Sequence, residues 1–328
     1  MTDLKFGWLF AVAVSVLSCV VEQGGAVAES KPMSGQPGAN DDLAAALRSH
    51  LDVLSIEIGE RSIVRGDGLD RAKDYIAETF RAAGLSVREQ EYPYNVRHVA
   101  NLIAEPPGAS EDGAPLLIGA HYDTVPDTPG ADDNASGVAV MLELARWVAR
   151  QRPAAPVQFV AFTLEEPPNF ATRHQGSRVF VRELVARGET VRGAVILEMV
   201  GLTTPKQEYP FVLRWAGYPE AGNFIGVVGS QASRAFGKKV LQAMRRYPAL
   251  PVESLFVWFN GWVLPDTRLS DHTSFWDEGL PALMVTDTAY FRNPYYHTPA
   301  DRADTLDYAF MARLVESMKL VIDELAVP

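Results

Sequence analysis

The residues best suited to chemistry lie in one short segment, 119–137, which reads GAHYDTVPDTPGADDNASG. It holds a histidine, His121, and several carboxylates, among them Asp133. Neutral imidazole is a good zinc ligand, and a carboxylate can bridge two cations and balance their charge. The segment therefore predicts a metal site. A plainer interpretation stays open, in which the acidic residues only cap a helix that begins near residue 136 and His121 is an ordinary turn histidine.

Two more carboxylates, Glu165 and Glu166, follow the apolar run at residues 157–164. If one of them binds a metal, its neighbour can reach a water at that metal and remove a proton. Taken alone, however, such a pair is more typical of a solvated surface.

Glu198 is a lone carboxylate in the apolar run 191–200, which is predicted to be a strand buried on both faces. Burying an ionised carboxylate is costly, so either a metal or a cationic side chain must compensate it. His297, one of only 6 histidines in the chain, lies just before the predicted final helix at residues 306–325. Together these segments indicate a composite site of histidines and carboxylates.

The order of the motifs HYD, GADDNASG, EE, LEMVG, SDH and HTPAD resembles the M28 family of zinc peptidases, and in particular its exported bacterial aminopeptidase-like members. The resemblance extends from about residue 41 to the C-terminus. It implies an aminopeptidase with two zinc ions, for which cobalt or manganese could substitute, and peptides as substrates. The site residues that it implies are His121 and Glu198 on one ion, Glu166 and His297 on the other, Asp133 bridging both, Asp123 behind His121, and Glu165 as general base. Many family members have Asp at the position of Glu198, where Glu is a known variant.

The SDH motif supplies two further candidates, Asp271 and His272. The resemblance implies a loop beside the active site here, so Asp271 is expected either to support the metal ligands or to contact substrate. A helix N-cap near residue 273 explains Asp271 equally well.

Three alternatives remain. Glutaminyl cyclases resemble this pattern but use one zinc, so metal stoichiometry would distinguish them. Carboxypeptidases of the family carry an inserted domain for which this chain has no room. Non-catalytic, receptor-like members lose ligands, whereas every ligand position is filled here.

The elements that must position these residues alternate between strand-like and helix-like patterns. Helical spacing covers residues 43–54 and 69–83, and strand-like runs cover 85–92 and 99–104. This alternation predicts an α/β fold, a three-layer αβα sandwich with a mostly parallel central sheet. Ligands of such sheets lie at the carboxyl ends of the strands, where we expect the zinc site.

The pattern loosens at about residues 202–269, an irregular elaboration in which we predict only one strand, 224–228, and one helix, 233–246. It is rich in aromatic residues. Some of them could line a hydrophobic specificity site, but we expect most to pack in the core; they are Tyr209, Phe211, Trp215, Tyr218, Trp258, Phe259 and Trp262.

Composition and the N-terminus set further limits. The chain has 328 residues, 47% of them hydrophobic, so a single catalytic domain over residues 41–328 can bury a full core. The net charge of −11, without clustered basic residues, argues against a nucleic-acid partner. The apolar run 6–21 predicts a signal peptide ending at residue 28, or a lipoprotein signal ending at residue 18 with lipid on Cys19. Either route predicts an exported, periplasmic or extracellular enzyme whose only membrane contact is the signal or the lipid, followed by a flexible linker at residues 29–40.

Overall fold

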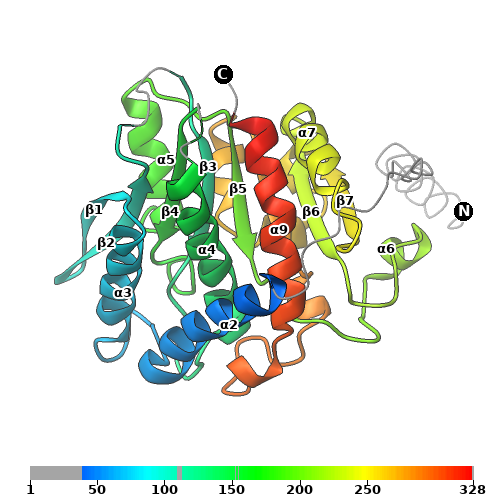
Figure 1. Ribbon diagram of the computed structural model, residues 1–328, viewed down its shortest axis with the longest axis horizontal. Coiled ribbons are helices and arrows are strands. Elements are labelled where there is room, and N and C mark those ends of the chain that lie inside the picture. Colours follow the sequence, from blue (N-terminus) through cyan, green and yellow to red (C-terminus); the bar gives the residue numbers. More distant parts are fainter. Residues whose placement is uncertain (1–38, 109–112, 152, 154, 327–328) are drawn as a thin grey trace, which may run out of the picture.

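The computed structural model describes residues 39–108, 113–151, 153 and 155–326, and an 8-stranded sheet forms its centre (Figure 1). The strand order is β1-β2-β4-β3-β5-β8-β6-β7. The strands are β1 (Ser86–Tyr94), β2 (Arg97–Glu105), β3 (Leu116–His121), β4 (Val157–Phe162), β5 (Gly193–Glu198), β6 (Ile225–Ser230), β7 (Val252–Val257) and β8 (Ala282–Thr286). The predicted signal sequence, Cys19 and most of the predicted linker lie outside the described residues.

The four central strands, β4, β3, β5 and β8, run parallel to one another. β2 is antiparallel to β4, and β6 is antiparallel to β8 while its neighbour β7 runs parallel to β6. The carboxyl ends of the central strands therefore meet at one edge of the sheet, together with the amino ends of β6 and β7. β3 and β5 are buried along their whole length, as their apolar runs predict.

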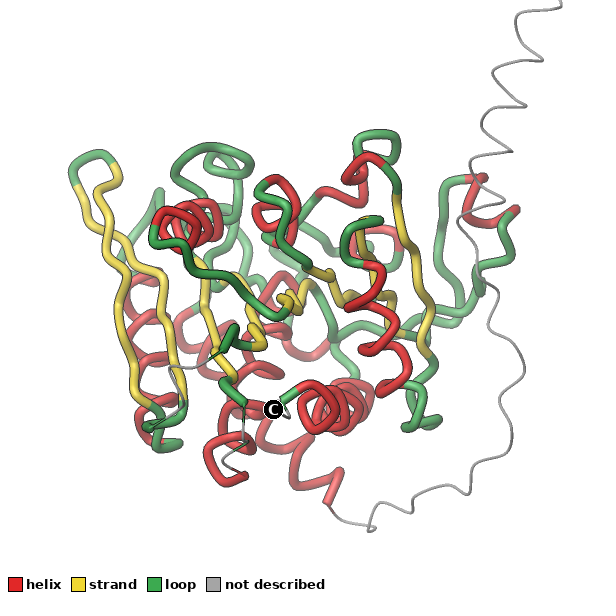
Figure 2. The backbone as a smooth tube through the Cα atoms, turned by 90° about the horizontal axis from the view of Figure 1, so that it is seen from above, coloured by secondary structure: helices red, strands yellow, loops and turns green. Residues whose placement is uncertain are grey.

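Helices cover both faces of this sheet (Figure 2). One hydrophobic core includes side chains of α3, α4, α7 and α9, and a second core includes side chains of α5 and α8. The described helices are α2 (Ala39–Leu51), α3 (Gly68–Ala82), α4 (Gly137–Gln151), α5 (Gly176–Ala186), α6 (Phe211–Trp215), α7 (Arg234–Met244), α8 (His272–Asp277) and α9 (Tyr308–Leu325). The predicted αβα sandwich with a mostly parallel sheet is confirmed. Within the described ranges, no helix combines the length and apolar character needed to span a bilayer.

The region at residues 202–269 differs from its prediction in two respects. It contributes not only β6 and α7 but also the short helix α6 and the strand β7. β7 is an edge strand in which two of the first three residues, Glu253 and Ser254, are polar, so its apolar signal is weak. The expectation that most of its aromatic side chains pack in the core is wrong. Trp215, Phe259 and Trp262 are 62%, 71% and 68% exposed, and Trp258 is 36% exposed.

Candidate metal centre

Four of the predicted site residues lie where three central strands end, on the shared carboxyl edge. His121 is the last residue of β3 and Glu198 the last residue of β5, while Glu165 and Glu166 follow the end of β4. Glu198 is therefore at the end of its apolar strand rather than inside it. His297 reaches the same edge from the loop between β8 and α9. Residues up to 176 positions apart in sequence thus meet where open α/β sheets bind ligands.

The loop after β3 is held in shape by a glycine and a buried arginine. Gly130 has a φ of +56°, and a Cβ there would come within 2.4 Å of both the Asp133 carbonyl oxygen and the Thr124 methyl group. The fully buried guanidinium of Arg61 donates hydrogen bonds to the backbone carbonyls of Tyr122, at 2.8 Å, and Gly130, at 2.8 Å. These contacts fix the backbone that carries Asp133.

Neighbours of Asp133 complete this support. The backbone N–H groups of Asp132 and Asp133 donate to the two carboxylate oxygens of Asp301, at 2.9 and 3.1 Å. Asn134 accepts a hydrogen bond from Gly137, the first residue of α4, so Asn134 caps that helix. Asp133 is thereby free to face the strand ends, and the plain interpretation that the acidic residues of this loop serve only as caps does not hold for it.

A first group of ligand atoms surrounds the Nε2 atom of His121. Asp133 Oδ1 lies 3.3 Å from this nitrogen and Glu198 Oε1 lies 3.4 Å from it, and all three side chains are buried. Four ligands at about 2.0–2.1 Å from a tetrahedral zinc ion lie roughly 3.3 Å from one another. The spacing of this group fits that arrangement.

A second group surrounds the Nε2 atom of His297. Asp133 Oδ2 and Glu166 Oε2 both lie 3.2 Å from it. Asp133 therefore presents one oxygen to each group, as a bridging carboxylate would. His297 Nε2 and Glu166 Oε1 are buried and have no hydrogen-bond partner among the described residues, which is expected of atoms that ligate a cation.

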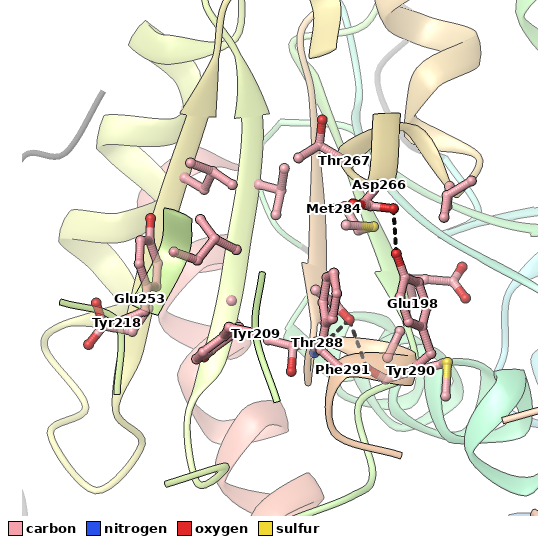
Figure 3. A pocket seen from close by; sticks show the side chains of 18 of the residues that line it. Glu198, Tyr209, Tyr218, Glu253, Asp266, Thr267, Met284, Thr288, Tyr290 and Phe291 are labelled. Carbon is pink, nitrogen blue, oxygen red and sulfur yellow. Dashed lines mark hydrogen bonds between the residues drawn. The ribbon is translucent and has the colours of Figure 1, made fainter. Parts of the chain in front are cut away.

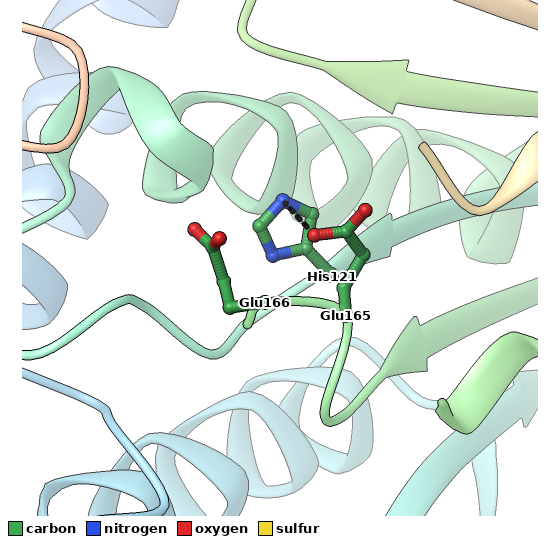
Figure 4. Close-up of side chains that lie close together, drawn as sticks. All are labelled: His121, Glu165 and Glu166. Atoms are coloured by element: carbon green, nitrogen blue, oxygen red, sulfur yellow. Dashed lines mark ion pairs between the residues drawn. The ribbon is translucent and has the colours of Figure 1, made fainter. Parts of the chain in front are cut away.

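The two adjacent glutamates take different positions around the His121 ring (Figure 4). Glu165 Oε2 is 3.9 Å from His121 Nε2, longer than the ligand spacings of either group. Asp123 holds both glutamates in place, because Oδ1 and Oδ2 of Asp123 accept the backbone N–H groups of Glu165, at 3.0 Å, and Glu166, at 3.1 Å. Asp123 Oδ1 also lies 3.5 Å from His121 Nδ1, on the side of the ring away from the ligand group.

Burial of so many acidic groups perturbs their ionisation. Burial, followed by the charge of Asp133, raises the pKa of Glu166 to about 8, and burial raises the pKa of Glu165 well above its ordinary value. Burial also acts to raise the pKa of Asp133, but the close imidazoles of His121 and His297 outweigh it and lower that pKa. The two histidines do not balance the negative charge of this cluster, so the donor set fits bound cations.

The SDH motif is also at the site, without a ligand position. Asp271 does not cap α8 with its side chain; its Oδ1 accepts from Gln175 Nε2 at 2.9 Å, and its buried Oδ2 has no partner among the described residues. Burial raises the pKa of Asp271 to about 7. His272 turns away from the cluster, since its Nε2 bonds to the Thr267 carbonyl at 2.9 Å and its ring packs on Trp276. Asp271 is thus fully buried with one unpaired carboxylate oxygen, whereas His272 is part of the packing.

Four supporting residues were not predicted from the sequence. Arg61 and Asp301 hold the Asp133 loop, Ser270 donates to Glu198 Oε2 at 2.7 Å, and the Tyr296 ring stacks on His297 with centroids 3.7 Å apart. Ser270 belongs to the SDH motif, Asp301 belongs to the HTPAD motif and Tyr296 precedes His297, so the motifs could have indicated all three. Arg61 carries no such signal.

Comparison with known protein families shows which family this chain belongs to. The family model described as "Peptidase family M28" matches residues 101–322. The chain belongs to peptidase family M28. This M28 chain is 38% identical over 277 residues to protein YfbL of Escherichia coli (strain K12), which is named as uncharacterized, with 81% of this chain and 83% of YfbL covered.

Other M28 relatives carry names that state an activity. Aminopeptidase YwaD of Bacillus subtilis (strain 168) is 28% identical over 215 residues, covering 63% of this chain and 39% of YwaD. A probable leucine aminopeptidase of Arthroderma otae is 25% identical, covering 68% of this chain and 55% of that protein. The chain thus spans about half or less of the length of these two relatives.

Solved structures show the same fold in two kinds of enzyme. BSAP, a zinc aminopeptidase from Bacillus subtilis, has a TM-score of 0.67 at 16% identity, covering 86% of this chain and 94% of BSAP. Porphyromonas gingivalis glutaminyl cyclase has a TM-score of 0.63 at 20% identity, covering 86% of this chain and 98% of the cyclase. Fold alone therefore does not separate the peptidase from the cyclase.

Proposed function

We propose that this M28 chain is a zinc-dependent aminopeptidase that removes N-terminal residues from peptides. The observation that carries the proposal is the pair of ligand groups sharing Asp133, with nitrogen–oxygen spacings of 3.2–3.4 Å. His121 and Glu198 would hold one zinc ion, and Glu166 and His297 would hold the other. Cobalt or manganese could substitute, because the same imidazole and carboxylate donors suit them.

A pair of zinc ions in such a centre would supply Lewis acidity that polarises a peptide carbonyl and lowers the pKa of water. The protein's own contribution is to position the proton acceptor. Glu165 is adjacent to the ligand groups but outside their spacing, so its carboxylate is available to take a proton from the attacking water and deliver it to the leaving amine. Asp123 would orient this base through the Glu165 N–H and keep the His121 ring in place.

The charge around the site supports an exopeptidase acting on a free amino terminus. Glu165, Glu198 and Asp271 are all buried here, and the Asp271 Oδ2 atom lacks a partner among the described residues. A substrate ammonium group would compensate this negative charge. Asp271 is accordingly proposed as a substrate contact.

A glutaminyl cyclase is the second candidate, and its structural similarity to this chain supports considering it. Such an enzyme needs one zinc ion, for which Asp133, Glu166 and His297 would suffice. The complete second group around His121 favours the peptidase. A receptor-like role is disfavoured because every ligand position is filled.

Action outside the cytoplasm is also proposed, on the apolar run 6–21 at the N-terminus. Cell fractionation of the full-length protein, with and without Cys19→Ala, would test it. Recovery in the cytoplasm would contradict export, and loss of membrane association in the variant would indicate lipidation at Cys19.

The decisive experiment combines metal analysis with substrate choice. The purified protein is assayed on a panel of aminoacyl amides and on a peptide with N-terminal glutamine, before and after chelation, and again after zinc is restored. We expect about two zinc ions per chain, hydrolysis of the amides, loss of activity with chelator, and recovery with zinc. One zinc ion with cyclisation of the glutaminyl peptide would establish the cyclase instead, and activity that survives chelation would refute a metal mechanism.

A further inference from the structure

A cavity of about 150 Å³ opens beside Glu198 on the face of the sheet that α8 covers (Figure 3). Glu198 belongs to its wall, so the cavity adjoins the proposed metal centre. A volume of about 150 Å³ is enough for a group the size of benzene. The cavity therefore accommodates one side chain of a bound substrate rather than several residues.

The register of the sheet determines how the cavity is laid out. Glu198 of β5 pairs with Thr286 of β8, Thr286 pairs with Gly226 of β6, and Gly226 pairs with Glu253 of β7. Directly paired residues project from the same face of a sheet, so Glu198 and Glu253 stand at opposite sides of the cavity (Figure 3). Three strand spacings put their Cα atoms about 14 Å apart.

Thr286 and Gly226 line the cavity between the two glutamates, and its walls are largely apolar. Gly226 pairs directly with Glu253 and has no side chain, and even a Cβ there would come no closer than 3.5 Å to another atom. The apolar wall is provided by residues that include Leu213, Phe224, Val228, Leu255, Met284 and Phe291. A long aliphatic chain fits such a passage.

The charged residues lining the cavity are all acidic: Glu198, Glu253 and Asp266. Asp266 accepts a hydrogen bond from Tyr290 at 2.6 Å, but Glu253 has no hydrogen bond or ion pair among the described residues. Burial raises the pKa of Glu253, and the charge of Arg245 opposes that rise without an ion pair between the two side chains. The buried Tyr209 hydroxyl also lines the cavity and is likewise without a partner in the described part of the chain.

We propose that this cavity receives the side chain of the substrate's N-terminal residue and prefers lysine or arginine, with Glu253 as the counter-ion. The aliphatic stem lies against the apolar wall, and the cation ends beside Glu253, where the Tyr209 hydroxyl is a further acceptor. This inference rests on the proposed aminopeptidase activity. The negative charge disfavours an acidic side chain, and a purely apolar one makes no hydrogen bond or ion pair with Glu253.

The test compares lysyl with norleucyl amides, because norleucine has a similar unbranched stem without the charge. We expect the lysyl substrate to have a kcat/KM about tenfold higher, and Glu253→Gln to reduce that advantage to about twofold or less while norleucyl hydrolysis is retained. Asp266→Asn is the matched control, a carboxylate of the same cavity that already has a partner, and it should leave the ratio within about twofold.

Three results would overturn the inference: no preference for lysine over norleucine, an unchanged ratio in Glu253→Gln, or an equal change in Asp266→Asn. In each of these cases amide hydrolysis itself persists, so the aminopeptidase proposal survives. If no amide is hydrolysed, the proposed function fails first. Calorimetric binding of lysinamide and norleucinamide to the zinc-loaded Glu165→Gln protein then still tests the cavity without turnover, and equal affinities would refute the preference.

Discussion

The two halves of the sheet carry different kinds of side chain at the same edge. Beyond β3, β4 and β5 lies a dense group of buried carboxylates and histidines whose positions are fixed by backbone hydrogen bonds, as with Asp123 and Asp301. Near the same edge, on the face of β8, β6 and β7 that α8 covers, lies a largely apolar cavity. The difference suggests that reactivity is concentrated in the first half and substrate selection in the second, with Glu198 belonging to both.

The largest expected effect comes from Glu165→Gln in the first half. The amide keeps the size of the side chain but cannot take a proton, so kcat/KM should fall by about 10²- to 10⁴-fold. Zinc content should stay the same, because Glu165 lies outside the ligand spacing. The measurements are steady-state kinetics on an aminoacyl amide and metal analysis of the same preparation.

Glu143→Gln is the control for this substitution, since Glu143 is a largely buried glutamate of α4 that bonds to His50 rather than to the site. It should retain wild-type kinetics. If the Glu165→Gln protein had wild-type activity, Glu165 would not be the general base.

A smaller loss is expected from Asp123→Asn. The amide oxygen can accept the N–H of Glu165 or of Glu166, but the amide nitrogen cannot accept the other, so one glutamate loses its support. Removing a group that positions metal ligands typically costs about 10- to 100-fold in metal affinity or activity. Zinc titration against a competing chelator measures the metal affinity, and steady-state kinetics measure the activity. If both values match those of the wild type, the hydrogen bonds of Asp123 do not position the site.

The sequence was informative to different degrees in the two halves. In the first, each strand end carries its own signal, because a carboxylate or histidine directly after an apolar run is chemically unusual. Arg61 could not be found in this way, since it acts on backbone carbonyls about 60–70 positions away in sequence, and those contacts exist only in the folded chain.

In the second half the relevant residues carry almost no local signal. Glu253 reads as an ordinary polar residue of an edge strand, and it faces Glu198 only because β6 and β7 run antiparallel to β8. The exposed tryptophans were predicted as core residues because composition alone does not distinguish a buried aromatic cluster from a surface one. Hydrophobic periodicity thus predicts layers well, but not the order of strands that creates a cavity.

Gly226→Ala tests whether the cavity in the second half of the sheet selects the substrate side chain. The new methyl group meets only ordinary contacts, the nearest atom being the Thr286 carbonyl oxygen at 3.5 Å, so the fold should tolerate it. It would narrow the passage toward Glu253, and we expect kcat/KM to fall roughly tenfold for substrates with long N-terminal side chains. Alanyl substrates, which do not enter the passage, serve as the internal control. An equal fall for alanyl and lysyl amides would mean that the cavity does not select the side chain.

The smallest effect is expected from substitution of Trp262, which tests whether the exposed aromatic residues belong to the substrate-selecting region. Its ring is 68% exposed and lies under the guanidinium of Arg268, 4.0 Å from the ring centroid, while Arg268 also pairs with Asp277 at 2.7 Å. An exposed cation–π contact contributes about 0.5–1 kcal/mol, so Trp262→Ala should lower the free energy of unfolding by no more than that. Because Trp262 does not line the cavity, kcat/KM on lysyl and norleucyl amides should stay unchanged. Denaturant unfolding and the same two assays measure these values, and a large loss of activity with normal stability would place the exposed aromatic loop within the substrate-selecting region.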